Sequence, residues 1–115
     1  MTDLESLTKR VVKFRDARDW EQFHNPKDTA VSLLLEAAEF LEHFQWKSPD
    51  EIKTHLKKKH SDVSEELCDV LYWVLLIAHD LKIDIENEFE RKMKKNEIHY
   101  PVEKARNRHT KYTEL

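Results

Sequence analysis

The chain has 115 residues, of which 37% are charged and 39% hydrophobic, and its formal net charge is −3. This length argues for a single domain covering residues 1–115, and so much mixed charge beside a normal apolar fraction argues for solvated helix faces rather than for disorder. Glycine is absent altogether, which excludes glycine-rich phosphate-binding loops, dinucleotide-binding fingerprints and the tight Asn-Gly turns of β-hairpins, so we predict an all-α protein.

The N-terminal part of the chain predicts two helices separated by a turn. Apolar side chains recur at roughly helical spacing over residues 2–18, and Thr2 is a suitable N-cap for this first helix. The segment DWEQFHNPKD, residues 19–28, breaks the pattern and contains an Asn-Pro turn signal. A second helix with an apolar stripe follows from about residue 27 to residue 44.

Two further helices are marked by their capping residues. Ser48 and the proline after it predict a short polar helix over residues 49–59, because serine is a favoured N-cap and proline fits the first helical position. Asp84 is the predicted N-cap of another helix, which ends at about residue 97. We expect Ile85, Phe89 and Met93 on the inner side of this helix, at the spacing of one apolar stripe.

Between these two helices lies the most apolar one, residues 62–81. It is apolar on all sides, so it is expected to be buried, and Cys68 within it is expected to pack as a small buried hydrophobic residue. The whole pattern predicts a four-helix bundle with one short extra helix, followed by a basic tail over residues 98–115.

The apolar surface of residues 62–81 also has consequences for association. One layer of four helices cannot cover all of it, which predicts that the protein binds a second copy of itself.

The longest uninterrupted apolar run, Val70–Ala78, is too short to span a bilayer, and the charged start MTDLESLTKR does not resemble a secretory signal. We therefore expect a cytoplasmic protein that binds no membrane and, with its negative net charge, no nucleic acid polymer.

Four acidic residues form two pairs with helical spacing. Glu36 and Glu39 are three residues apart in the second helix, and Glu66 and Asp69 are three apart in the helix over residues 62–81. Residues at this spacing lie on one helix face. If the two helices pack antiparallel, four carboxylates meet, and their repulsion requires protons or a cation. Oxygen ligands in this number suit Mg²⁺, with Mn²⁺ as an alternative.

The residues alone leave two interpretations of these acids open. A Glu-x-x-Glu pair is usual on a solvated helix edge, whereas Asp69 lies in a helix expected to be buried and is harder to explain without a metal ion. A di-iron or di-manganese bundle typically contains two Glu-x-x-His pairs, and this sequence contains none. Zinc is disfavoured because the histidines are scattered along the sequence and the single cysteine has no mate.

The acidic pairs and their surroundings resemble a known family. With 26 residues between Glu39 and Glu66, they resemble the ExxE…ExxD signature of the MazG-like all-α nucleoside triphosphate pyrophosphohydrolases. The stretches RDWEQFHNP, FQWK, EELCDVLYW, KMKKNEIHYP and KYTEL are similar to the dCTP pyrophosphatase branch, and the resemblance covers essentially the whole chain. It implies Mg²⁺-dependent hydrolysis of a deoxynucleoside triphosphate, dCTP or a 5-modified dCTP, to the monophosphate and pyrophosphate, for nucleotide-pool sanitation. It also implies a homodimer or homotetramer.

The resemblance further implies roles for individual residues. It makes four acids the metal ligands: Glu36, Glu39, Glu66 and Asp69. Glu39 or Glu66 then orients or deprotonates the attacking water, with Glu39 as the first choice. The implied substrate-binding residues are Trp20, His24 and Trp46 around the nucleobase, Trp73 at the sugar, and Lys92, Asn96 and Tyr100 at the phosphates or sugar. For each aromatic side chain taken alone, packing in the core is the competing interpretation.

Two other functions remain open from the sequence. The same fold can act on dUTP or on a broad set of nucleoside triphosphates, because the edge contacts that select a base are not visible in the sequence. A helical interaction module, in which the acids only bind basic partners, is the non-enzymatic alternative.

Overall fold

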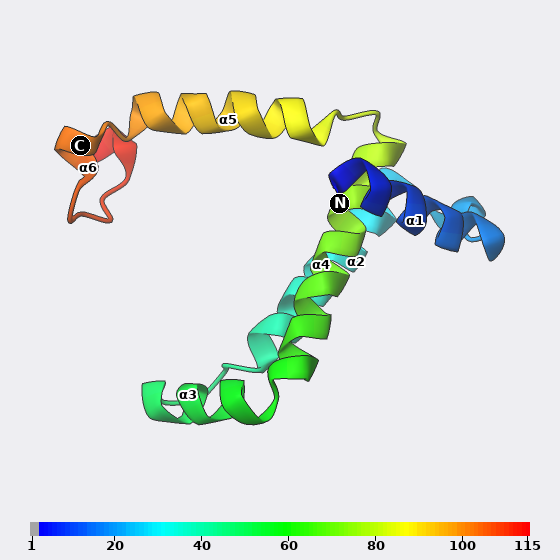
Figure 1. Ribbon diagram of the computed structural model, residues 1–115, viewed down its shortest axis with the longest axis horizontal. Helices are drawn as coiled ribbons and strands as arrows, with labels where there is room; N and C mark the ends of the chain where they lie inside the picture. Colours follow the sequence, from blue (N-terminus) through cyan, green and yellow to red (C-terminus); the bar gives the residue numbers. More distant parts are fainter. Residues whose placement is uncertain (1–2) are drawn as a thin grey trace. The chain divides into compact units, whose positions relative to one another are not determined.

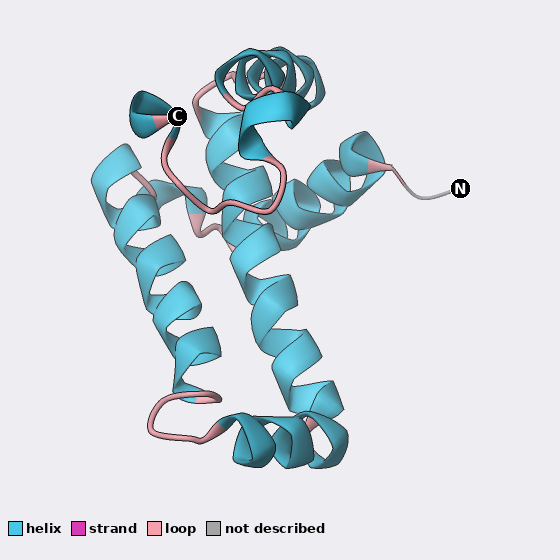
Figure 2. Cartoon of the chain, turned by 90° about the vertical axis from the view of Figure 1, so that its left-hand side faces the viewer, coloured by secondary structure: helices cyan, strands magenta, loops and turns pink. Residues whose placement is uncertain are grey.

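The computed structural model describes residues 3–115, which contain α-helices and short 3₁₀ helices and no strand (Figure 1, Figure 2). The α-helices in this range are α1 Leu4–Ala17, α2 Pro26–Glu42, α3 Pro49–Lys58, α4 His60–Asp80, α5 Ile85–His99 and α6 Val102–Ala105, and the 3₁₀ helices are η1 Glu21–Phe23 and η2 Tyr112–Glu114. The chain divides into two compact units, one ending at Lys82 and one beginning at Ile83. The predicted all-α class is therefore confirmed.

Capping side chains set the starts of the first two helices. The carboxylate of Asp3 accepts a hydrogen bond from the backbone N–H of Ser6 at 2.8 Å, which makes Asp3 the N-cap of α1. The predicted cap, Thr2, lies outside the described residues. Asn25 caps α2 by accepting from the N–H of Asp28 at 2.9 Å, and proline occupies the first helical position after it.

The starts of α3 and α5 are the predicted ones. Ser48 and Glu51 form a capping box, in which each side chain accepts from the other residue's backbone N–H, at 3.2 and 2.9 Å. Asp84 caps α5 by accepting from the N–H of Asn87 at 3.2 Å. Because these contacts are local in sequence, the capping residues could be identified before the fold was known.

Helix α4 is the centre of the first unit. Helices α1, α2 and α3 all pack against it, and α2 and α4 lie side by side and run in opposite directions (Figure 1, Figure 2). The apolar side chains that are buried come from α4 itself: Val63, Leu75, Leu76 and Ala78. The antiparallel pairing assumed for the two acid-bearing helices is therefore present.

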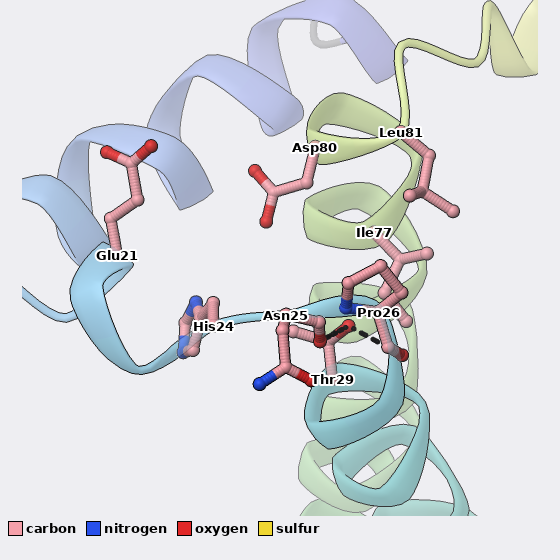
Figure 3. Close-up of a pocket in the computed structure, with 8 residues that line it drawn as sticks. All are labelled: Glu21, His24, Asn25, Pro26, Thr29, Ile77, Asp80 and Leu81. Atoms are coloured by element: carbon pink, nitrogen blue, oxygen red, sulfur yellow. Dashed lines mark hydrogen bonds between the residues drawn. The ribbon is translucent and has the colours of Figure 1, made fainter.

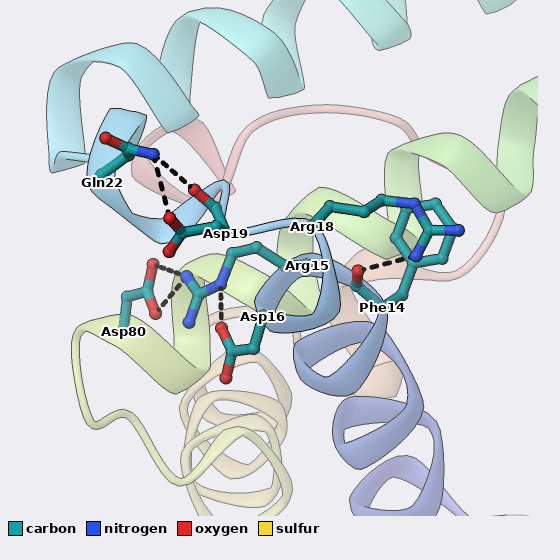
Figure 4. Close-up of polar contacts among 7 residues, drawn as sticks. All are labelled: Phe14, Arg15, Asp16, Arg18, Asp19, Gln22 and Asp80. Carbon is teal, nitrogen blue, oxygen red and sulfur yellow. Dashed lines mark hydrogen bonds and ion pairs between the residues drawn. The ribbon is translucent and has the colours of Figure 1, made fainter.

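A buried ion pair joins α1 to the end of α4 (Figure 4). Arg15 is 1% exposed, and its Nη1 donates to both carboxylate oxygens of Asp80, at 2.8 and 2.7 Å, while its Nε donates to Asp16 at 3.1 Å. Burial alone lowers the pKa of Arg15, but the two carboxylates outweigh this effect and the pKa is raised. The guanidinium therefore stays charged inside the fold.

Burial of α4 differs from the prediction. Its N-terminal half exposes Leu67 and Leu71, to 54% and 39%, and Cys68 is exposed as well, so the prediction of a helix buried on all sides is wrong for a single chain. The reason is that, among the described residues of the first unit, no other element covers these side chains. An apolar helix face left open in this way is a typical protein–protein contact surface.

The second unit contains α5, α6 and η2. Of the three residues predicted on the inner side of α5, Ile85 is half-buried, whereas Phe89 and Met93 are 64% and 39% exposed. The prediction is therefore wrong for Phe89 and Met93 within the second unit. The ring of Tyr112 stacks on His99 at 4.1 Å between ring centroids, which folds the C-terminal residues back onto the end of α5. The tail predicted from residue 98 is thus partly helical, and α5 extends to His99.

Two predictions about the whole chain remain. Three of the four long helices belong to the first unit and α5 to the second, so a single four-helix bundle domain over residues 1–115 stays a prediction. None of the described helices combines the length and the hydropathy that crossing a membrane requires.

Candidate functional site

Three acidic side chains converge between α2 and α4. Glu36 and Glu39 on α2 and Glu66 on α4 each place a carboxylate oxygen within 4.8 Å of the others. Glu36 and Glu66 are half-buried, and Glu39 is exposed. The spacing of three residues puts the two α2 acids on one face, and the antiparallel packing turns that face toward Glu66. We refer to these three residues as the acid cluster.

The electrostatics of the acid cluster are unfavourable without a cation. The pKa of Glu36 is raised to about 7, first by burial, then by the adjacent carboxyl of Glu39 and by the charges of Asp69 and Glu66. The pKa of Glu66 is raised as well, first by burial and then by Glu39 and Asp69, while His43 acts in the opposite direction. The carboxylates therefore repel one another when all are ionised.

The acid cluster fits a divalent cation. One oxygen each of Glu36 and Glu66, Oε2 in both, is buried and has no hydrogen-bond partner among the described residues. A buried acceptor without a partner costs free energy, and a cation bound between the two helices would satisfy both oxygens and remove the repulsion. Carboxylate oxygens are the donors that Mg²⁺ and Mn²⁺ prefer.

Asp69 lies near the acid cluster without being part of it. Its charge contributes to the raised pKa of both Glu36 and Glu66, although its carboxylate is not one of the three that converge. It is exposed, so the expectation that Asp69 is a buried carboxylate is wrong for the single chain. Its role as a fourth metal ligand stays a prediction.

The turn between α1 and α2 carries two of the predicted nucleobase residues. The ring of His24 packs edge-on against Trp73 of α4, with 5.4 Å between the centroids, and Trp20 packs edge-on against Phe14 at 5.8 Å. Trp20 remains 41% exposed. The Nδ1 atom of His24 is buried and has no hydrogen-bond partner among residues 3–115, so this ring nitrogen is left unsatisfied.

A pocket of about 280 Å³ opens beside His24 (Figure 3). Its lining comes from the turn, the start of α2 and the end of α4: Glu21, His24, Asn25, Pro26, Thr29, Ile77, Asp80 and Leu81. Thr29 is buried and donates to the carbonyl oxygen of Asn25 at 3.0 Å, which holds this edge of the pocket in place. The pocket combines apolar walls with polar groups, as small-molecule sites do.

The remaining predicted substrate residues are Trp46 and three residues of the second unit. Trp46 is 92% exposed, so the chain gives its indole almost no contacts. Lys92, Asn96 and Tyr100 lie in the second unit, where Tyr100 packs edge-on against Tyr112 at 5.8 Å. Their roles at the phosphates or sugar stay predictions.

One arrangement was not anticipated from the sequence. His43, directly after α2, and His55, in the last turn of α3, place Nδ1 and Nε2 2.8 Å apart. The premise that the histidines are scattered is therefore wrong for this pair. His43 follows Glu39 by four residues, a helical spacing that could have placed it on the same side as the acid cluster.

Comparisons with known proteins agree with the all-α fold. Residues 31–115 match the model of the MazG-like family. The chain is 36% identical to dCTP pyrophosphatase 1 of Rattus norvegicus and 35% identical to that of Homo sapiens, each over 97% of this chain and 67% of the relative. A crystal structure of a pyrophosphatase from Archaeoglobus fulgidus superimposes with a TM-score of 0.80 at 40% identity, covering 88% of this chain and 94% of that one.

These similarities define an all-α enzyme of the nucleoside triphosphate pyrophosphohydrolase class. The chain belongs to the MazG-like family.

Proposed function

We propose that the chain hydrolyses dCTP, or a 5-modified dCTP, to the monophosphate and pyrophosphate with Mg²⁺ bound at the acid cluster. The observation that carries this proposal is the pair of buried carboxylate oxygens without partners on Glu36 and Glu66, in a chain similar to dCTP pyrophosphatase 1. We further propose that the enzyme acts in nucleotide-pool sanitation and that it does so in the cytoplasm.

In the proposed mechanism the four acids hold the metal ion, and Mn²⁺ is the alternative to Mg²⁺. When bound, the cation polarises the phosphate oxygens and neutralises charge that develops on them. Glu39 is the exposed member of the acid cluster, so its carboxylate can reach an incoming water, orient it and accept its proton. Glu66 is half-buried and is the second choice for this role. The water oxygen forms a bond to the α-phosphorus as the bond to the α,β-bridging oxygen breaks, and pyrophosphate leaves with that electron pair.

The nucleobase is proposed to bind near the turn that carries Trp20 and His24. Indole rings provide stacking surfaces for any base, and a buried ring nitrogen without a partner, as on His24, can select a base edge. Trp46 and Trp73 are proposed to complete the contacts to base and sugar. Lys92, Asn96 and Tyr100 are proposed to bind phosphates or sugar.

The enzyme is also proposed to act as a homodimer or homotetramer. Helix α2 carries a stripe of exposed apolar side chains at helical spacing: Val31, Leu34, Leu35 and Leu41, which are 48%, 68%, 58% and 61% exposed. The exposed Leu67 and Leu71 of α4 add to the apolar surface of this helix pair. Burial of such faces against a second copy is the usual way to remove them from water.

The test is a panel of nucleotides assayed for pyrophosphate release over a Mg²⁺ titration. dCTP and 5-methyl-dCTP are expected to be the best substrates, with dUTP and the other triphosphates slower. Glu66→Gln and Asp69→Asn are expected to lose at least about a hundredfold in kcat, since each removes a metal ligand. Glu65→Gln, on an exposed position of the same helix, is the matched control and is expected to keep its activity.

Three outcomes would change the proposal. A preference for dUTP, or equal rates on all triphosphates, would replace the substrate and keep the reaction. Full activity of Asp69→Asn would remove Asp69 from the metal site. A folded protein that hydrolyses no nucleotide would refute the proposed enzymatic activity and favour a helical interaction module.

A further inference from the structure

Aromatic side chains of α1, of the turn after it and of α4 form a continuous row. Each ring packs edge-on against the next, in the order Trp20, Phe14, Tyr72, Trp73 and His24. Successive ring centroids lie 5.8, 6.1, 5.2 and 5.4 Å apart, and successive ring planes make angles of 73°, 89°, 81° and 66°. Edge-on pairs at such distances are favourable because the positive edge of one ring meets the negative face of the other. We refer to these five residues as the aromatic row.

The aromatic row begins and ends in the turn between α1 and α2. Its two end members, Trp20 and His24, are the turn residues proposed to contact the nucleobase. The residues between them, Glu21–Phe23, form η1 and are all exposed. The turn therefore has no buried side chains of its own between these two positions. The orientation of both end members must come from the rings against which they pack.

Tyr72 is the middle ring of the aromatic row. It contacts Phe14, which supports Trp20, and it contacts Trp73, which supports His24. Successive side chains on a helix point about 100° apart, so Tyr72 can meet α1 while Trp73 meets the turn. Tyr72 is half-buried and belongs to α4, the helix against which the rest of the first unit packs. One residue on this central helix thereby supports both ends of the turn.

Phe14 depends on its neighbours for its orientation. It is 43% exposed, so burial alone does not fix its ring. The guanidinium carbon of Arg18 lies 3.8 Å from the centroid of this ring, and Nη1 of Arg18 donates to the carbonyl oxygen of Phe14 at 2.9 Å (Figure 4). Arg18 and Tyr72 together hold Phe14 in place as the support of Trp20.

We propose that Tyr72 is a positioning residue for the nucleobase site, and that it fixes Trp20 and His24 relative to each other through Phe14 and Trp73. The inference rests on the proposed function, because it concerns the residues proposed there to contact the base. Side chains that are already oriented lose little conformational freedom when a ligand binds. Affinity for the nucleoside part of the substrate therefore depends on the aromatic row, whereas affinity for the phosphates depends on the acid cluster and its metal ion.

Steady-state kinetics of Tyr72→Leu test the proposal. Leucine removes both edge-on contacts, so KM for dCTP is expected to rise about tenfold. The value of kcat is expected to change less than about twofold, because contacts to the base are equally strong in the bound substrate and in the transition state. Inorganic triphosphate has no base, and its inhibition constant is expected to stay within about twofold of the wild-type value. Tyr72→Phe keeps the ring and is expected to have the wild-type KM.

Two further variants separate positioning from packing. Val74→Ala, at a half-buried position of α4 outside the aromatic row, is the matched control for lost packing and is expected to keep the wild-type KM. Phe14→Leu removes the support of Trp20 from the opposite end of the same contact, and its exposed position makes it tolerable should Tyr72→Leu fail to fold. It is expected to raise KM for dCTP about fivefold.

A double-mutant cycle measures whether Tyr72 acts through the turn residues. In a Trp20→Ala/His24→Ala background, Tyr72→Leu is expected to have no further effect on KM, because the side chains that it positions are gone. An equal effect of Tyr72→Leu in both backgrounds would overturn the inference, and so would a wild-type KM in both Tyr72→Leu and Phe14→Leu. A Tyr72→Phe protein as impaired as Tyr72→Leu would assign the effect to the hydroxyl group and contradict the role of the ring.

The wild-type protein distinguishes failure of this inference from failure of the proposed function. Hydrolysis of dCTP by the wild type, with KM unchanged in the variants, would show that the proposed function stands without the positioning role of Tyr72. Absence of nucleotide hydrolysis by the folded wild type would show that the proposed function has failed, and the inference with it.

Discussion

Asp80 binds the guanidinium of Arg15 through both of its carboxylate oxygens, and it thereby fixes the start of the turn that carries Trp20 and His24. The carbonyl oxygen of Arg15 accepts a hydrogen bond from the backbone N–H of Trp20 at 3.2 Å. Asp80 also lines the pocket beside His24 (Figure 3). The ion pair between α1 and α4 is thus part of the support for the proposed substrate site.

Breaking this ion pair is expected to destabilise the protein strongly. Asp80→Ala leaves the buried charge of Arg15 without its bidentate partner, which typically costs about 3–5 kcal/mol of unfolding free energy. Urea denaturation measures the change, and Lys9→Ala, which breaks the exposed 3.3 Å pair with Glu5, is expected to cost less than about 1 kcal/mol. The double variant Arg15→Met/Asp80→Leu is expected to recover most of the loss. A cost for Asp80→Ala as small as that of Lys9→Ala would contradict this account.

The metal-free protein is expected to lose stability as the pH rises from about 5 to above 7. The folded-state pKa of Glu36 is about 7, above its ordinary value of 4.5, so in this window the folded state holds a proton that the unfolded state has released. Stability therefore falls with rising pH until Glu36 is ionised in both states. Thermal unfolding in EDTA at several pH values measures the trend.

Two controls separate this effect from general pH sensitivity. Glu36→Gln is expected to flatten the decrease, whereas Glu65→Gln, at an exposed position of α4, is expected to leave it unchanged. Saturating Mg²⁺ is expected to raise the unfolding temperature most at the highest pH, where the acid cluster is fully ionised. A Glu36→Gln protein with the wild-type pH profile would show that Glu36 is not the group responsible.

Trp46 is expected to affect substrate binding without affecting folding. Its side chain is 92% exposed, so Trp46→Ala should change the unfolding free energy by less than about 0.5 kcal/mol. If the indole stacks on the base, KM for dCTP should rise about tenfold or more, since such stacking contributes about 1–3 kcal/mol. Trp46→Phe, which keeps an aromatic face, should restore most of the affinity. Unchanged KM in Trp46→Ala would remove this residue from the substrate site.

The apolar stripe of α2 is expected to be a contact between copies of the chain. Leu34→Glu places a charge at the most exposed leucine of the stripe and is expected to produce monomers, because burying that charge in an interface is costly. Light scattering after size-exclusion chromatography measures the mass in solution. Lys53→Glu on α3 is the control for added negative charge and is expected to keep the wild-type mass. A monomeric wild-type protein would disprove self-association.

The helices could be predicted well because their signals are local. The capping box at Ser48 and the caps at Asn25 and Asp84 each involve residues three apart, so they can be recognised in the printed sequence. The burial of α4 could not be predicted in the same way. Whether Cys68 or Leu67 is covered depends on which surface lies opposite, and the described part of the first unit provides none.

The acid cluster could be predicted where it depends on residue spacing within one helix, and contacts that depend on how the helices pack could not. Glu36 and Glu39 are one helical turn apart, and a single assumption, the antiparallel packing of two helices, brought Glu66 to them. The pairing of His43 with His55 spans 12 residues across a turn, and that of Arg15 with Asp80 spans 65. Both depend on how the helices are placed in three dimensions, which residue spacing does not encode.

The complete absence of glycine has a consequence at the ends of the helices. Four residues that are not glycine take the left-handed backbone conformation directly after a helix or its last turn: Asp19, Trp46, Lys82 and Asn107, with φ between 57° and 66°. A residue with a β-carbon enters this region at a cost of about 1–2 kcal/mol, and it has fewer alternative conformations there than glycine would have. Trp46 is therefore held in this conformation by the turn around it, which the backbone N–H of Lys47 closes by donating to the carbonyl oxygen of Phe44 at 3.2 Å. An indole with almost no neighbours can in this way be held ready for a partner that arrives later.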